Sequence, residues 1–167
     1  AYESAQCLVG SEMCIRDSSE KAQEELKVFE RAVHDVLDLT MTSFKNGDLN
    51  LARQVEPLEE VIDGLSLDVK QGHVRRLRKG KCTIELGFIL SDVITNFERV
   101  SDHCSNIAVC LVQVNEDEFD THAYLDELRQ EDNKDFQSKV LACREKYQLP
   151  PTKQERLAEK NAKLLAE

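Results

Sequence analysis

The sequence has no tryptophan, only three prolines and six glycines, and few aromatic residues of any kind. Scarce proline and glycine mean few tight turns, so the chain is predicted to be mostly helical. No apolar run approaches the roughly 20 residues that cross a bilayer as a helix. Basic residues are outnumbered by acidic ones, 22 to 32, and the formal net charge of the 167 residues is -10. That charge argues against nucleic acid as a partner.

Sequence motifs that carry catalysis are also missing. There is no glycine-rich phosphate loop, no nucleophile elbow and no His-Glu-x-x-His. Helical di-iron enzymes take Glu-x-x-His from their core helices. The residue three positions before each of the four histidines is never Glu. We therefore predict that the chain is not an enzyme.

The first 18 residues differ from the rest of the chain. The stretch "SEMCIRDS", residues 11–18, matches one reading frame of the transposon end that is ligated onto DNA fragments in sequencing libraries. A signal peptide or a first strand is the alternative, but "AYESAQCLVG" lacks a basic leader and a long apolar core. We interpret residues 1–18 as a sequencing or cloning scar outside the fold, and expect the natural chain to begin further upstream.

The cysteines outside that segment are Cys82, Cys104, Cys110 and Cys143, and no two of them form a Cys-x-x-Cys pair. A zinc ribbon or a thioredoxin motif is therefore not predicted. Cys104 falls among apolar residues at helical spacing and is expected in the core. The pattern indicates a reducing, cytoplasmic compartment.

Three segments carry apolar residues at alternating steps of three and four, which is the seam of a left-handed helical bundle. The first and least regular seam is Leu26, Phe29, Val33, Val36 or Leu37, Met41 and Phe44. The second is Leu51, Val55, Leu58, Ile62, Leu65 and Val69. The third is Leu86, Leu90, Val93, Phe97, Val100, Cys104, Ile107 and Leu111.

The connections between these segments are short. Gly47 and Gly80 can each end a helix in the left-handed conformation, and Asp48 and Thr83 can cap the helices that follow. Pro57 lies inside the second seam, where it should either kink the helix or mark the start of its regular part. Because short connections make neighbouring helices antiparallel, the sequence predicts an all-α fold, an antiparallel three-helix bundle.

We place this bundle at residues 19–115, followed by a short helical C-terminal tail. Residues 116–149 are interpreted as an acidic linker and helical extension, with a short helix ending near Leu128 and another around residues 136–147. That second helix carries Phe136, Val140 and Tyr147 on one side. Residues 150–167 are interpreted as a mobile, charged tail, in which Thr152 and Glu155 form the capping box of a last helix.

Two predicted helices carry the same Glu-x-x-x-Asp spacing, Glu59 with Asp63 and Glu98 with Asp102. Residues four apart lie on one face of a helix. At 100° per residue, Glu98 and Asp102 lie far from the apolar seam and are expected to face outward. Four carboxylates on neighbouring helices favour a hard cation such as magnesium, calcium, manganese or ferric iron. The alternative is a solvated acidic face without an ion.

Other polar residues lie near these pairs. Candidate residues around the ligands are Asp92, Asn96, His103 and Asn106. Histidine at the edge of an apolar seam and asparagine at a bundle edge are also typical of helix-to-helix hydrogen bonding.

"HVRRLRKGK" is the densest basic run of the chain. Cations at a helix C-terminus are favoured by the helix dipole, which is one explanation. The other is a surface that contacts anionic lipid or an acidic partner, made of Arg75, Arg76, Arg78, Lys79 and Lys81.

The second and third helices resemble a PhoU domain in "VEPLEEVIDGL", "GHVRRLRKGKCTIELGFILSDVITN" and, most specifically, "ERVSDHCSNIA". The family pattern Glu-Arg-[Ile/Val]-x-Asp-His followed by Asn-Ile-Ala begins here at Glu98 and ends at Ala108. The resemblance covers roughly residues 19–114. The segments "CTIELG" and "DTHAYLDEL" are similar to the cytosolic end of bacterial sodium/phosphate cotransporters.

This resemblance implies an all-helical regulatory module of phosphate uptake, without catalysis of its own. It implies multinuclear metal clusters on Glu-x-x-x-Asp motifs, with iron, manganese or zinc held by Glu59, Asp63, Glu98 and Asp102. PhoU proteins have two three-helix repeats and this chain shows one, so a second repeat or a homodimer would complete the arrangement.

Two functions remain open. The first is the cytosolic tail of a sodium/phosphate symporter in the cell membrane, whose partner is the transporter portion of the same parent chain. The second is a free-standing adaptor of phosphate-responsive signalling bound to a phosphate-transport complex. A metal-free helical scaffold is the third reading.

Overall fold

The computed structural model describes residues 20–116, 125, 128 and 133–151. The predictions for residues 1–18, for the capping box at Thr152 and for most of the short helix ending near Leu128 lie outside these ranges. Leu125 and Leu128 are themselves helical.

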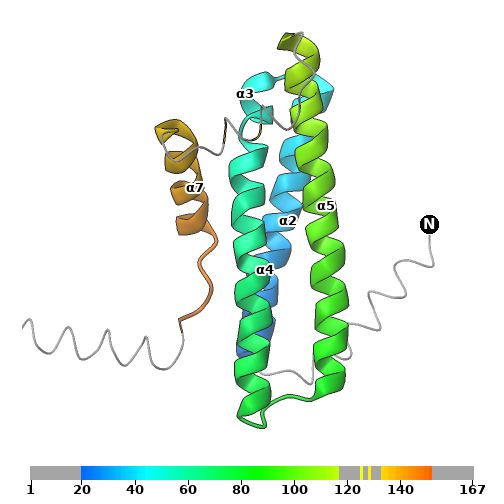
Figure 1. The fold of residues 1–167 in the computed structure, drawn as a ribbon, viewed down its shortest axis with the longest axis vertical. Helices are drawn as coiled ribbons and strands as arrows, with labels where there is room; N and C mark the ends of the chain where they lie inside the picture. Colours follow the sequence, from blue (N-terminus) through cyan, green and yellow to red (C-terminus); the bar gives the residue numbers. More distant parts are fainter. Residues whose placement is uncertain (1–19, 117–124, 126–127, 129–132, 152–167) are drawn as a thin grey trace, which may run out of the picture.

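Three long helices form the bundle: α2 (Glu20–Asn46), α4 (Val55–Arg78) and α5 (Ile84–Glu116). They run side by side in Figure 1, with α4 antiparallel to the other two. A single turn, α3 (Leu49–Ala52), joins α2 to α4. The predicted all-α three-helix bundle is confirmed. No helix in the described ranges has the length and apolarity needed to cross a membrane.

The predicted helix ends are also present. Gly47 and Gly80 have φ angles of 63° and 62°, the left-handed region that favours glycine. The Asp48 carboxylate accepts hydrogen bonds from two backbone N–H groups and so caps α3. Thr83 Oγ1 accepts from the Leu86 N–H. Pro57 lies in the first turn of α4, where no intrahelical N–H donor is required, so it marks the start of the helix.

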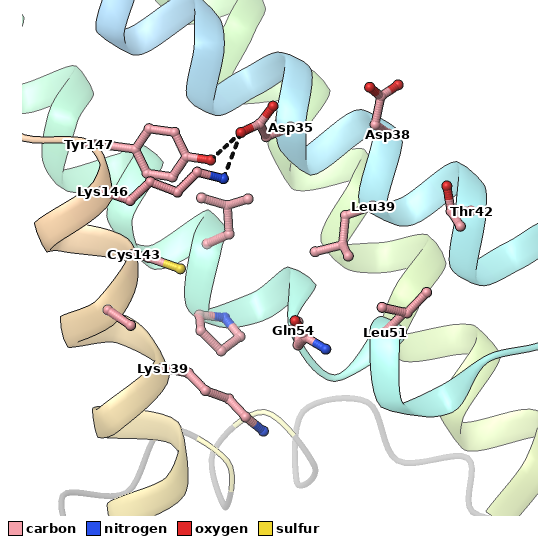
Figure 2. Close-up of a pocket in the computed structure, with 13 residues that line it drawn as sticks. Asp35, Asp38, Leu39, Thr42, Leu51, Gln54, Lys139, Cys143, Lys146 and Tyr147 are labelled. Carbon is pink, nitrogen blue, oxygen red and sulfur yellow. Dashed lines mark hydrogen bonds and ion pairs between the residues drawn. The ribbon is translucent and has the colours of Figure 1, made fainter.

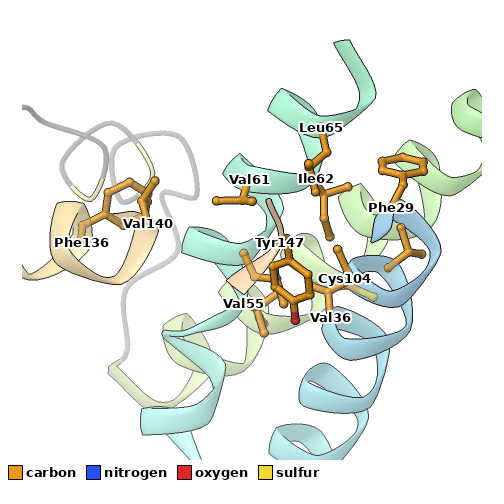
Figure 3. Packing of buried hydrophobic residues seen from close by; sticks show 14 of the residues in the cluster. Phe29, Val36, Val55, Val61, Ile62, Leu65, Cys104, Phe136, Val140 and Tyr147 are labelled. Carbon is orange, nitrogen blue, oxygen red and sulfur yellow. The ribbon is translucent and has the colours of Figure 1, made fainter. Parts of the chain in front are cut away.

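The core lies where all three helices meet (Figure 3). The whole predicted seam of α4 after Leu51 is buried. Phe29 of α2 packs against Phe97 of α5, with ring centroids 5.8 Å apart. Cys104 is 3% exposed and belongs to this core, as expected. No disulfide joins the four cysteines of the described part.

The predicted α2 seam is right as far as Val36, one of the two alternatives at that position, and wrong beyond it. Leu37, Met41 and Phe44 are all exposed, whereas Thr40 and Ser43 are buried. The Thr40 hydroxyl donates to the Val36 carbonyl and the Ser43 hydroxyl to the Thr40 carbonyl. Because their hydroxyls are satisfied within the helix, small polar residues can occupy the buried side.

The predicted α5 seam is displaced by about one residue. The residues of α5 that are buried are Ile94, Ser101, Cys104, Ser105, Ala108, Val109, Val112 and Gln113. Ile107 is exposed, and most of the remaining predicted seam is only half-buried. The reason is that α5 contacts two neighbours. The apolar seam faces α2, and a more polar stripe beside it faces α4.

The helix predicted around residues 136–147 is α7 (Lys134–Lys146), which packs on α4 away from α5 (Figure 1). Phe136, Val140 and Tyr147 are buried together, as the spacing predicted. The Tyr147 hydroxyl donates to the Asp35 carboxylate of α2 at 2.5 Å, and the Lys146 ammonium donates to the same oxygen at 2.9 Å (Figure 2). Asp35 therefore anchors the end of α7.

A buried ion pair joins α2 to α4. Arg76 lies 2.5 Å from the Glu25 carboxylate, and both side chains are almost fully enclosed. Gly72 leaves room for the pair, because a Cβ there would lie 2.9 Å from Glu25 Oε2 and 3.2 Å from Arg76 Nη1. Gly64, on the same helix, has open space at the equivalent position.

Replacing Gly72 with Ala should destabilise the bundle by about 1–2 kcal/mol, because displacing a charged hydrogen-bonded pair outweighs the gain in helix propensity. The matched control, Gly64→Ala, should instead stabilise it by about 0.5–1 kcal/mol. Urea-induced unfolding followed by circular dichroism measures both. Equal stabilisation by the two substitutions would contradict the role given to Gly72.

The anchor of α7 should depend on pH. Hydrogen bonds from Tyr147 and Lys146 hold the pKa of Asp35 below its ordinary value of 3.8. Its contribution to stability is therefore present above about pH 4 and lost as the pH falls through the lower folded value. Burial, and then the bond to Asp35, raises the pKa of Tyr147 above 10.0, so that contribution is lost at high pH.

Asp35→Asn should therefore lower the free energy of unfolding by about 1 kcal/mol at pH 7 and flatten its decline between pH 5 and 3. Asp135→Asn, which breaks only an exposed pair with Lys139 within α7, is the control and should cost less than about 0.5 kcal/mol. Urea unfolding at each pH measures both. An Asp35 variant with the stability and pH profile of the parent would refute the anchor.

Candidate metal centre between α4 and α5

Polar groups line the contact between α4 and α5. Glu56, 3% exposed, accepts a hydrogen bond from Ser105 Oγ at 2.5 Å. Ser66 and Ser101 are also buried here. Small side chains let two helices approach closely, so acidic residues from both helices can converge along this seam.

Three of the four predicted ligands lie together. One carboxylate oxygen each from Glu59, Asp63 and Asp102 lies within 4.8 Å of the others. Glu59 is 5% exposed, whereas Asp63 and Asp102 are exposed to solvent. We call these three residues the acidic trio. Two helices supply it: Glu59 and Asp63 come from successive turns of α4, and Asp102 comes from α5.

Glu98, the fourth predicted ligand, lies outside the trio. Its carboxylate is 2.9 Å from Lys70 Nζ of α4 and also accepts a hydrogen bond from Ser66. The sequence predicted that Glu98 and Asp102 would both face outward, and this holds for Asp102 only. Glu98 belongs to the polar stripe of α5 that faces α4, so its carboxylate is turned toward Lys70.

The trio fits a metal ion in size and chemistry. Oxygens that bind one cation at about 2.0–2.5 Å lie within about 5 Å of one another. Three carboxylates this close together repel one another, and a bound ion would reduce that repulsion. The two exposed members leave an entry path, and the buried Glu59 offers a fixed ligand. Carboxylate oxygens are suited to hard cations and to manganese.

The residues predicted around the ligands lie at the surface of α5. Asp92, Asn96, His103 and Asn106 are all exposed. The Asn96 amide donates to the Asp92 carbonyl of its own helix. Two further polar residues, Ser66 and Lys70 of α4, bind the carboxylate of Glu98. Neither Ser66 nor Lys70 was predicted from the sequence, although they continue the three-and-four spacing of Glu59 and Asp63 along α4.

The basic run divides into two sets. Arg76 is held by Glu25 and is not part of a contact surface. Arg75, Arg78, Lys79 and Lys81 are exposed at the end of the α4–α5 hairpin. His73 packs against Gly87, where a Cβ would lie 2.6 Å from His73 Nε2. Burial lowers the pKa of His73, with a smaller effect from Arg76.

A pocket of about 520 Å³ lies elsewhere, between α7 and the α2–α4 end of the bundle (Figure 2). Its walls include Asp35, Lys139, Cys143 and Tyr147. None of its lining residues is a predicted ligand. Burial raises the pKa of the Cys143 thiol, so this thiol is not activated as a nucleophile. The acidic trio is therefore the stronger candidate site.

Comparisons with known proteins agree with this fold and motif. The PhoU domain family matches residues 27–111. The phosphate-specific transport system accessory protein PhoU homolog 1 of Thermotoga maritima is 29% identical over 101 residues. That match covers 58% of this chain and 44% of the relative, so the chain spans less than half of the relative's length. No solved structure matches. Because the family match covers half of the chain and the matched residues form a three-helix bundle, this chain belongs to the PhoU domain family.

Proposed function

We propose that this chain is a regulatory domain of phosphate uptake, and that it forms the cytosolic tail of a sodium/phosphate symporter. The observation that carries the phosphate role is the PhoU match over residues 27–111, supported by a relative whose name is that of a phosphate-transport accessory protein. The symporter assignment rests on the resemblance of "CTIELG" and "DTHAYLDEL" to the cytosolic ends of such transporters. In this arrangement the domain lies on the cytoplasmic side, and its partner is the membrane portion of the same parent chain.

We further propose that the acidic trio binds iron, manganese or zinc. Glu59 is the fixed ligand, while Asp63 and Asp102 close on the ion from two helices. Binding would therefore tie α4 to α5 at mid-bundle, which is a means by which metal could alter the shape presented to a partner. Glu98 is assigned to Lys70 rather than to the ion. A homodimer would place a second trio nearby and complete the two-repeat arrangement.

A free-standing adaptor of phosphate-responsive signalling is the second candidate, because the curated relative is an accessory protein. The natural gene upstream of residue 19 distinguishes the two. Apolar spans of about 20 residues there support the symporter. A second PhoU repeat without such spans supports the adaptor and contradicts the symporter.

Adding manganese, iron(III) or zinc to chelator-stripped protein should raise its melting temperature. A ligand that binds only the folded state stabilises it by about 1.4 kcal/mol at ten times its Kd, which amounts to several degrees for a domain of this size. Asp63→Asn or Asp102→Asn should abolish the rise. Glu98→Gln should leave it unchanged, because Glu98 is already held by Lys70 and Ser66.

Asp92→Asn removes an exposed charge from α5 outside the trio and is the control for net charge. A parent protein indifferent to all three metals would support the metal-free scaffold and overturn the proposal. Loss of the response in Glu98→Gln, with Asp102→Asn unaffected, would show that the three-carboxylate assignment is wrong.

In cells that carry the natural gene, Asp63→Asn combined with Asp102→Asn should alter phosphate uptake or its repression by external phosphate. The expected reason is that a domain unable to bind metal no longer regulates the transporter. Uptake of labelled phosphate measures this, with Asp92→Asn as control. If the double variant has lost the metal response in vitro but takes up phosphate as the parent does under both conditions, the proposed regulation through this site is refuted.

A further inference from the structure

The end of the α4–α5 hairpin combines exposed cations with exposed apolar side chains. We call the following residues the hairpin tip: Val74, Arg75, Arg78, Lys79, Lys81, Ile84 and Phe88. We propose that the hairpin tip docks on the surface of an anionic phospholipid bilayer. This inference does not depend on the phosphate role or on the acidic trio.

Positive charge is concentrated at this end of an otherwise acidic chain. Residues 69–84 contain six Lys or Arg residues and no Asp or Glu, although the whole chain has a net charge of -10. Lys70 and Arg76 are used internally, by Glu98 and Glu25. The other four are exposed, and the structure gives none of them an ion pair with another described residue.

Apolar side chains stand beside these cations. Phe88 is 70% exposed, Ile84 60% and Val74 45%. Ile84 and Phe88 are four residues apart and share one face of α5. The left-handed Gly80 reverses the chain, and the contact of His73 with Gly87 holds the two helices together just behind the turn. Val74 directly follows His73 and Phe88 directly follows Gly87, so both apolar residues lie next to this contact.

The helix dipole explains cations at the end of α4, but it does not explain why Ile84 and Phe88 are left in water. A bilayer accounts for both features. Lys and Arg are attracted to anionic headgroups, while aromatic and aliphatic side chains enter the boundary with the acyl chains. A stable protein interface uses about 20–30 residues on each side, and a tip of seven exposed residues is too small for one. A lipid surface requires no matching shape.

The acidic remainder of the chain does not prevent this docking. Asp63 and Arg78 are 15 residues apart on α4, which corresponds to about 22 Å along the helix. That is more than twice the Debye length of about 8 Å at physiological ionic strength. The hairpin tip can therefore reach the headgroups while the repulsion from the acidic trio is screened. The bundle then stands on the membrane with its candidate metal centre away from the lipid.

The test is sedimentation of the 167-residue chain with vesicles of phosphatidylcholine alone or with 30% phosphatidylserine, in chelator. The parent should bind only the anionic vesicles, and high salt should release it. Arg78→Gln with Lys79→Gln should lower the partition coefficient about 25-fold, since each cation near the surface contributes about a fivefold factor. Lys27→Gln with Lys45→Gln removes the same charge from exposed positions of α2 and should change it much less.

A second pair of variants keeps the charge constant. Phe88→Ser should weaken binding several-fold, whereas Phe44→Ser, which removes an equally large exposed ring from α2, should not. Circular dichroism confirms that each variant is folded. Equal binding to neutral and anionic vesicles, no binding to either, or equal losses in the tip and control variants would overturn the proposal. Binding to polyglutamate but not to vesicles would do so as well, and would indicate an acidic protein partner.

Discussion

The close packing of α4 against α5 is the constraint on which the rest of the structure depends. Serine and glycine occupy this contact where larger side chains would hold the helices apart: Ser66, Ser101 and Ser105 are buried, and Gly87 admits His73. Hydrogen bonds such as Ser105 to Glu56 offset the desolvation of carboxylates that the contact encloses. A polar contact of this kind brings carboxylate side chains from two helices close to each other. An apolar contact would not.

This polar contact also explains the shape of α5. A helix that touches two neighbours needs a wide buried face, and α5 divides that face between an apolar stripe toward α2 and a polar stripe toward α4. Phe97 meets Phe29 on the first, and Glu98 meets Lys70 on the second. Because α7 packs on the side of α4 away from α5 (Figure 1), it does not cover the α4–α5 contact that carries the acidic trio. Asp63 and Asp102 of the candidate site are therefore accessible to solvent, whereas α7 covers the other side of α4.

The sequence predicted the helices and their ends well, because glycine, proline and capping residues act locally. The helix ends at Gly47 and Gly80 and the cap at Asp48 could be predicted without knowing the tertiary structure. The faces of α2 and α5 were harder to predict. A pattern of apolar residues selects Met41, which is exposed, and omits Thr40, which is buried. The pattern cannot detect that the Thr40 hydroxyl is hydrogen-bonded within its own helix. The same error on α5 led to the prediction that Glu98 faces outward. The buried face of α5 is centred between the sides that contact α2 and α4, and not on the apolar stripe alone.

The acidic trio was accordingly predicted only in part. Spacing identified Glu59, Asp63 and Asp102, but pairing Glu98 with Lys70 depends on how α4 and α5 are set against each other, and no local pattern encodes that. The proposed metal centre requires that α4 and α5 converge on one cation. Anomalous diffraction from crystals grown with manganese tests it most directly. A single peak about 2.0–2.5 Å from oxygens of Glu59, Asp63 and Asp102, with Glu98 still on Lys70, is the predicted result. A peak bound by Glu98 without Glu59, or no peak between α4 and α5, would contradict it.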